Sequence, residues 1–134
     1  MNAIPLIGRI LFSMIFIMSG LNHFMQYENM TQFAQMNGVP LPGAAVIVSG
    51  IIILLGGVMI LVGYKAKIGA LLLFIFLIVA AFMMHSFWGL EGQESQNQMI
   101  HFMKNFSMAG GALIIYYFGS GPKSLDGDES EEEL

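Results

Sequence analysis

The three histidines of this chain lie near the ends of long apolar segments, and their side chains are the best candidates for chemistry. His23 ends the first segment, His85 ends the third, and His101 lies near the start of the fourth. Lys104 follows His101 by three residues, so the two share one side of a helix. Imidazole and ammonium groups donate hydrogen bonds to carbonyl oxygens and anions, and imidazoles also bind metals. These residues form a candidate site if the fold brings them together.

Three interpretations of this histidine layer are open. In the first, it is a polar lid whose imidazoles bond to water and backbone carbonyls at the membrane interface. In the second, it holds a quinone or another small apolar ligand, whose oxygen atoms accept hydrogen bonds from the histidines and the lysine. In the third, the imidazoles bind zinc or copper, although Lys104 places a cation beside that metal.

We predict the second interpretation, a ligand site without a metal. Its ligand-binding residues are His23, His85, His101, Lys104, Trp88 and Asn105. The aromatic residues expected to enclose the ligand are Phe24, Phe82, Phe87, Trp88 and Phe102.

A second polar pair lies at the opposite ends of the segments. Arg9 is about one turn into the first segment, and Asp126 follows the fourth. We expect these two to form a structural ion pair, or Arg9 to hold backbone carbonyls at the end of the fourth segment. The alternative is that Arg9 extends alone to lipid phosphates. None of these arrangements is a catalytic site.

The composition indicates that membrane-spanning helices position these residues. Of the 134 residues, 56% are hydrophobic and only 10% are charged, which is too little charge to cover a soluble domain. The apolar residues form four runs, at residues 4–26, 43–63, 68–88 and 99–118. We therefore predict an all-α, integral membrane four-helix bundle in a lipid bilayer, with residues 1–126 as one domain.

The first segment has one polar side. At 3.6 residues per turn, that side carries Arg9, Ser13, Phe16, Gly20 and His23. An ionisable side chain in the middle of the bilayer costs roughly 2.5–3.5 kcal/mol on insertion scales. This side should therefore face the other helices.

The connections between the segments suggest further features. Residues 27–42 carry an apolar residue at every third position, which predicts a short amphipathic surface helix between the first two spans. Ser95 and Gln98 have the spacing of a capping box for the fourth helix. Four of the five basic residues lie at the ends that share one side of the membrane, which predicts both termini in the cytoplasm and a multi-pass protein of the inner (cytoplasmic) membrane.

The remaining composition excludes several classes of function. Residues 127–134 hold most of the acidic side chains behind a net charge of −4, so we expect a disordered acidic tail. Nothing in this charge distribution suggests nucleic-acid binding. The chain has no cysteine, which excludes disulfides and thiolate metal sites within it.

An ordered set of motifs resembles the DoxX family of small four-helix membrane proteins. The matching features are Arg9, Ser19-Gly20-Leu21-Asn22-His23-Phe24, Gly38-Val39-Pro40, His85-Ser86-Phe87-Trp88, Lys104-Asn105, Gly110-Gly111, and the closing Gly119, Gly121 and Ser124-Leu125-Asp126. The resemblance implies a polytopic bundle. It also implies an association with membrane redox systems linked to quinol oxidation and thiosulfate:quinone oxidoreduction, and with soluble partners in some members.

Two functional hypotheses follow. The first is an accessory subunit of a membrane-associated oxidoreductase, with a quinone or small apolar ligand near the outer face and membrane or soluble oxidoreductase partners. The alternative is a non-enzymatic structural or assembly protein that acts through helix–helix and tail contacts. The sequence leaves open whether the chain is itself an enzyme.

Overall fold

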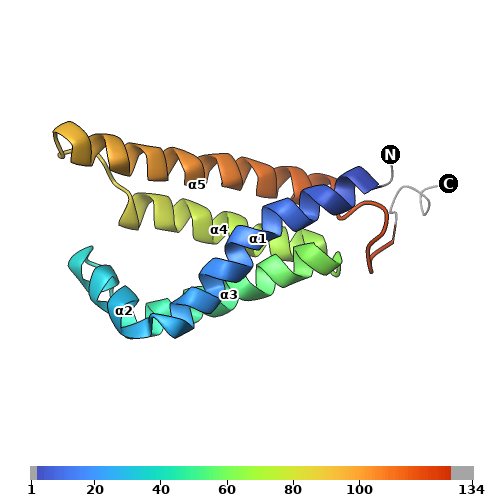
Figure 1. Ribbon diagram of the computed structural model, residues 1–134, viewed down its shortest axis with the longest axis horizontal. Helices are drawn as coiled ribbons and strands as arrows, with labels where there is room; N and C mark the ends of the chain where they lie inside the picture. The colour runs from blue at the N-terminus through green and yellow to red at the C-terminus, as the bar shows by residue number, and fades with distance from the viewer. Residues whose placement is uncertain (1–2, 128–134) are drawn as a thin grey trace.

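Five α-helices make up most of residues 3–127, which are the residues that the computed structural model describes (Figure 1). Their bounds are Ala3–Met25 (α1), Tyr27–Met36 (α2), Pro42–Val62 (α3), Ala66–Met84 (α4) and Gly92–Phe118 (α5). No strand occurs within this range. The predicted all-α class is therefore confirmed. The predicted acidic tail lies outside the described residues, except for Gly127.

Three of these helices, α1, α3 and α4, are long and apolar enough to cross a membrane. The longest helix, α5, begins with a polar stretch that includes Gln93, Glu94, Gln96 and Asn97. This stretch is why α5 lacks the apolar content of the other three. A short helix, α2, occupies the connection for which an amphipathic helix was predicted.

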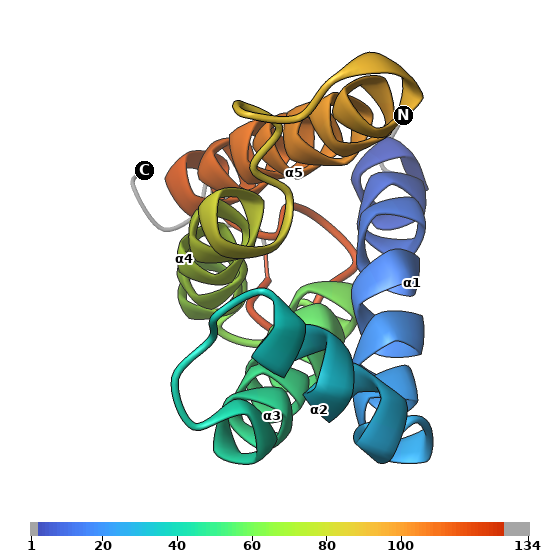
Figure 2. The same cartoon turned by 90° about the vertical axis from the view of Figure 1, so that its left-hand side faces the viewer.

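Each long helix packs mainly on its neighbour in the chain, so that α1 contacts α3, α3 contacts α4, and α4 contacts α5. The contact between α1 and α5 is slight by comparison. Viewed end-on, the four helices are arranged in a ring, and the segment after α5 crosses its far end (Figure 2). We call the end where α1 and α4 finish and α5 begins the histidine end, and the opposite one the arginine end.

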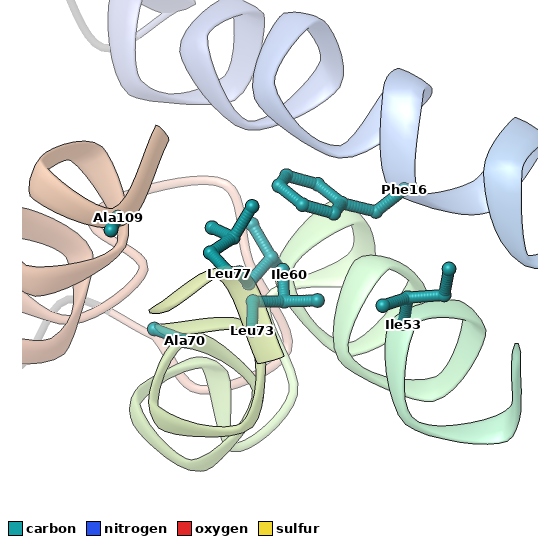
Figure 3. Close-up of a cluster of buried hydrophobic side chains, with 7 residues drawn as sticks. All are labelled: Phe16, Ile53, Ile60, Ala70, Leu73, Leu77 and Ala109. Carbon is teal, nitrogen blue, oxygen red and sulfur yellow. The ribbon is translucent and has the colours of Figure 1, made fainter. Parts of the chain in front are cut away.

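The core lies between α1, α3, α4 and α5 (Figure 3). Its buried side chains are Phe16, Ile53, Ile60, Ala70, Leu73, Leu77 and Ala109. Two adjacent glycines of α3 let the neighbouring helices approach closely: Gly56 lies against Leu73 and the backbone of Gly69 on α4, and Gly57 lies against Phe16 and Ile17 on α1. These approaches are possible because neither glycine has a side chain to hold the helices apart.

Two details of the α4–α5 connection correct the predictions. The third segment was predicted to be helical to residue 88, but α4 ends at Met84 and His85 already leaves helical geometry, with φ −128°. The capping box was also wrong, because α5 begins at Gly92. The two side chains of that motif bond elsewhere: Ser95 Oγ donates to the carbonyl of Phe87 at 3.4 Å, and Gln98 contacts His85.

Candidate functional site

His85 and His101 come together at the histidine end of the α4–α5 pair. Their rings stack with centroids 5.1 Å apart and an angle of 27° between the ring planes. His85 is the first residue after α4, and its Nδ1 lies 3.0 Å from Oε1 of Gln98, one turn before His101 on α5. Gln98 thus orients one imidazole of the pair. Its position three residues before His101 was the available sequence signal for this role.

His23 takes a different position from the other two histidines. It is buried on α1, with 6% of its surface exposed, and its Nδ1 lies 2.7 Å from the carbonyl oxygen of Ser19. Since a carbonyl oxygen can only accept, Nδ1 carries a hydrogen in this contact. The side chain lies against Gly50 of α3. Both views show the end of α1 lying away from α5 (Figures 1 and 2).

This arrangement bears on the metal interpretation. Within residues 3–127, no three histidine, aspartate or glutamate side chains are grouped closely enough to hold a metal ion. The two stacked imidazoles and the third, separate one supply no three-histidine centre.

The aromatic side chains of the histidine end form a cluster of their own. Its members are Phe82, Phe87, Trp88, Phe102 and Phe106, with ring centroids between 4.5 and 6.0 Å apart. These rings pack on one another across α4, the loop and α5, and edge-to-face contacts predominate. Phe24, which was expected among them, lies against Gly50 instead. The cluster acts as the packing that joins α4 to α5.

A shallow, open hollow of about 310 Å³ lies along one side of α5. Its lining residues are Met99, Ile100, Met103, Lys104 and Ser107. Lys104 is the single charged group among three long apolar side chains and a hydroxyl. Apart from Lys104, sequence reasoning missed these residues, although their spacing of three and four was a visible sign that they share a helix side. Asn105, from the predicted set, is partly buried and follows His101 by one turn.

The second polar group lies at the arginine end. Arg9 is buried, and its Nη2 donates to the carbonyl of Lys123 at 2.6 Å. Its Nε and Nη1 find no partner among the described residues. The carboxylate of Asp126 accepts from the backbone amides of Lys65 and Ala66, at 2.7 and 3.1 Å, and from the hydroxyl of Ser120 at 3.2 Å. The two predicted residues thus lie near one another and bond to separate partners.

Residues 119–127, which we call the clasp, cross the turn between α3 and α4. The amides of Leu125 and Asp126 donate to the carbonyls of Val62 and Gly63, at 3.1 and 2.7 Å. Gly63 has φ +68°, and the guanidinium of Arg9 and the side chain of Ser124 occupy the space that a Cβ there would need. Sequence reasoning missed Gly63, Ser120 and Ser124 as partners of this group. The clasp is therefore held by backbone and side-chain bonds to three different helices.

Comparison with known proteins matches the chain to one family and to two bacterial membrane proteins. The family model described as DoxX matches residues 4–86. The chain is 31% identical over 121 residues to the inner membrane protein YphA of Escherichia coli, covering 90% of this chain and 86% of that protein. It is 33% identical over 124 residues to the inner membrane protein YqjF of the same organism, covering 90% and 88%. No solved structure gives a significant match.

These relatives and the three apolar spans support the same localisation. Both relatives are named as inner membrane proteins, and α1, α3 and α4 can each cross a bilayer. The predictions of family resemblance and of a multi-pass inner membrane protein are confirmed.

Proposed function

The chain belongs to the DoxX family, and on that premise we propose that it is an accessory subunit of a membrane-associated oxidoreductase, which binds a quinone-like ligand at its histidine end. The observation that supports this most directly is the hollow on α5, where Lys104 lies among Met99, Ile100 and Met103. The hollow is shallow and apolar apart from one charged group and one hydroxyl. Small-molecule sites are likewise mostly apolar with a few polar groups, and 300 Å³ is about the lower limit of their size.

The chemistry of the lining suits a ligand that carries hydrogen-bond acceptors. A quinone ring has carbonyl oxygens that accept hydrogen bonds and no group that donates them. Lys104 has three N–H donors and no acceptor. His101 lies three residues earlier on the same helix, with its ring exposed on one side and stacked on His85 on the other. The residues of this chain would bind and orient the ligand, and the redox chemistry would belong to the quinone.

We further propose the membrane arrangement that this site requires. In it, α5 is a fourth span, so that the four long helices form one bundle with both termini in the cytoplasm. The distribution of basic residues supports this, because Arg9, Lys65, Lys67 and Lys123 gather at the arginine end and Lys104 alone lies toward the other. The histidine end then faces the outer side of the inner membrane.

The single tryptophan of the chain provides the test of the ligand. Trp88 belongs to the aromatic cluster beside the histidine pair, and quinones quench indole fluorescence at short range. Titration of the purified protein in detergent with decylubiquinone should give saturable quenching. The Lys104→Gln variant should weaken apparent affinity about tenfold or more, as expected for the loss of a charge-assisted hydrogen bond. Lys65→Gln, the same change at the arginine end, is the matched control.

Quenching that stays linear with quinone concentration would reflect partition into the micelle and would count against the site. The same conclusion would follow if Lys104→Gln and Lys65→Gln behaved alike.

A second function, a non-enzymatic assembly protein, is favoured by the exposed side of α5 around Gly110, which includes Met103 of the hollow. No atom lies within 4 Å of where a Cβ at Gly110 would be, and the side chains of Met103 and Ile114 on either side are exposed. Small residues in such a face allow close helix–helix contact in membranes. Purification in mild detergent separates the two proposals, because stable partners recovered without quinone-dependent quenching would favour assembly.

A further inference from the structure

We propose that the clasp sets the angle between α1 and α5 and so controls access to the hollow on α5. The consequence for ligand access rests on the proposed function, whereas the mechanical coupling stands on the contacts alone. The coupling depends on where α1 meets α5, on what anchors the clasp, and on how far α1 extends beyond its contact with α5.

Three contacts between α1 and the chain from α5 onward lie toward the arginine end. A Cβ at Gly111 would lie 3.0 Å from the ring of Phe12, and one at Gly121 would lie 3.1 Å from Pro5. Between these two levels, Arg9 donates to the carbonyl of Lys123. Beyond Phe12, toward the histidine end, α1 packs on α3 instead. There Gly20 lies against Leu54, and His23 lies against Gly50.

The clasp is anchored to the turn between α3 and α4. Two backbone bonds hold it to Val62 and Gly63, and the Asp126 carboxylate bonds to the first amides of α4. The clasp also carries the acceptor for Arg9. The position of α1 relative to α5 is therefore tied to whether the clasp is seated. Because Arg9 is buried, its guanidinium has no water to replace the Lys123 carbonyl if the clasp moves away, so unseating the clasp should displace α1.

A small tilt of α1 about its contact with α5 produces a larger displacement of the end of α1 at the histidine end. From Phe12 to the end of α1 at Met25 the helix is roughly 20 Å long, so a tilt of roughly 10° moves its end by roughly 3 Å. Gly111, Lys104 and Ser107 lie on one side of α5 by helical periodicity. Phe12 lies against this side at Gly111, so a change in the tilt of α1 widens or narrows the space in front of the hollow.

Because the chain has no cysteine, paired spin labels can measure this coupling without background. Leu21→Cys on α1 and Gln96→Cys on α5 report on the opening at the histidine end, since both positions are exposed. The pair is measured by double electron–electron resonance in the full chain, with and without Asp126→Ala. The conservative Asp126→Asn and, as a charge-matched control remote from the clasp, Glu28→Gln are measured in the same way.

The expected result is a shift of a few ångströms or a clear broadening of the distance distribution in Asp126→Ala. Asp126→Asn should give a smaller change, and Glu28→Gln none. A second labelled pair, Lys65→Cys with Leu125→Cys, reports whether the clasp itself is released, and circular dichroism confirms that the helices persist. An unchanged Leu21–Gln96 distance would overturn the proposal, whether or not the clasp is released.

Quinone quenching in the unlabelled wild type keeps this outcome distinct from failure of the proposed function. If quenching is not saturable but the distance depends on the clasp, the proposed ligand site is contradicted and the mechanical coupling is supported. If quenching is saturable but the distance does not change, the mechanical coupling is contradicted and the proposed ligand site is supported.

Discussion

The carboxylate of Asp126 lies 2.7 Å from the backbone nitrogen of Lys65 and thereby caps a helix that precedes it by about sixty residues. Lys65 is the N-cap residue of α4 and has no side-chain capping bond of its own. The first amides of a helix lack partners within the helix, and their partial positive charge favours an anion. The end of the chain thus supplies the cap that the α3–α4 turn does not contain.

Loss of this cap should destabilise the protein. We expect Asp126→Ala to lower the free energy of unfolding in mixed micelles by about 0.5–2 kcal/mol, the range for removal of a capping side chain. Asp126→Asn should lose less, because its amide oxygen still accepts one hydrogen bond. Glu28→Gln removes an equal charge from the exposed first turn of α2 and should leave the unfolding curve in place. Equal stability of Asp126→Ala and wild type would contradict the capping role.

Gly63 should tolerate a side chain much less well than Gly38. Both have a positive φ, +68° and +74°, so alanine at either position incurs about 1–2 kcal/mol of backbone strain. At Gly38 no atom lies within 4 Å of the new Cβ, whereas at Gly63 that position is taken by Arg9 and Ser124. Gly63→Ala should therefore lose at least twice the unfolding free energy of Gly38→Ala. A comparable loss in both variants would mean that the clasp is not seated against Gly63.

The packing of His23 on α3 can be tested by substitution of Gly50, which lies against it. A methyl group at Gly50 would lie 2.9 Å from Cβ of His23, so Gly50→Ala should cost about 1–3 kcal/mol through overpacking between α1 and α3. Gly110→Ala is the matched control, because the space at Gly110 is open and alanine is the better helix former by up to about 1 kcal/mol. Unfolding curves that shift in the same direction for both variants would contradict this packing.

The proposed orientation predicts which cysteines a membrane-impermeant maleimide reaches in intact spheroplasts. Gln96→Cys, near the start of α5, should be labelled from outside. Lys123→Cys, in the clasp, should be labelled only after the membrane is permeabilised. Both positions are exposed to solvent or lipid in the protein itself, so burial does not account for a difference. Labelling of both residues from the same side would show that α5 does not cross the membrane.

Much of the fold could be predicted from the sequence because apolar periodicity is a local property. The side of α1 that carries Arg9, Ser13, Phe16, Gly20 and His23 was predicted to face protein, and all five residues are buried. That prediction required only 3.6 residues per turn and the cost of a cation in lipid. The end of α4 was misplaced by four residues because His85-Ser86-Phe87-Trp88 continues the apolar pattern after the helix has ended.

The candidate site was predicted less completely, because it depends on which helices become neighbours. Depth along each helix correctly grouped His85 with His101, which lie on helices that pack together. His23 has a similar depth, but Gly20 and Gly50 bring α1 onto α3, so its ring is enclosed there. Arg9 was expected to pair with Asp126 or to hold backbone carbonyls at the end of the fourth segment. It donates to the carbonyl of Lys123, just after α5, while Asp126 accepts from the amide of Lys65.

The sequence by itself determined the membrane class, the helices and the buried side of α1, because hydropathy and helical period act between residues that are close in the chain. Only the tertiary structure decided that two imidazoles stack while the third packs on α3, and that the last described residues cap α4. Those outcomes depend on how closely helices approach at residues without side chains, and on backbone groups that every sequence has in common.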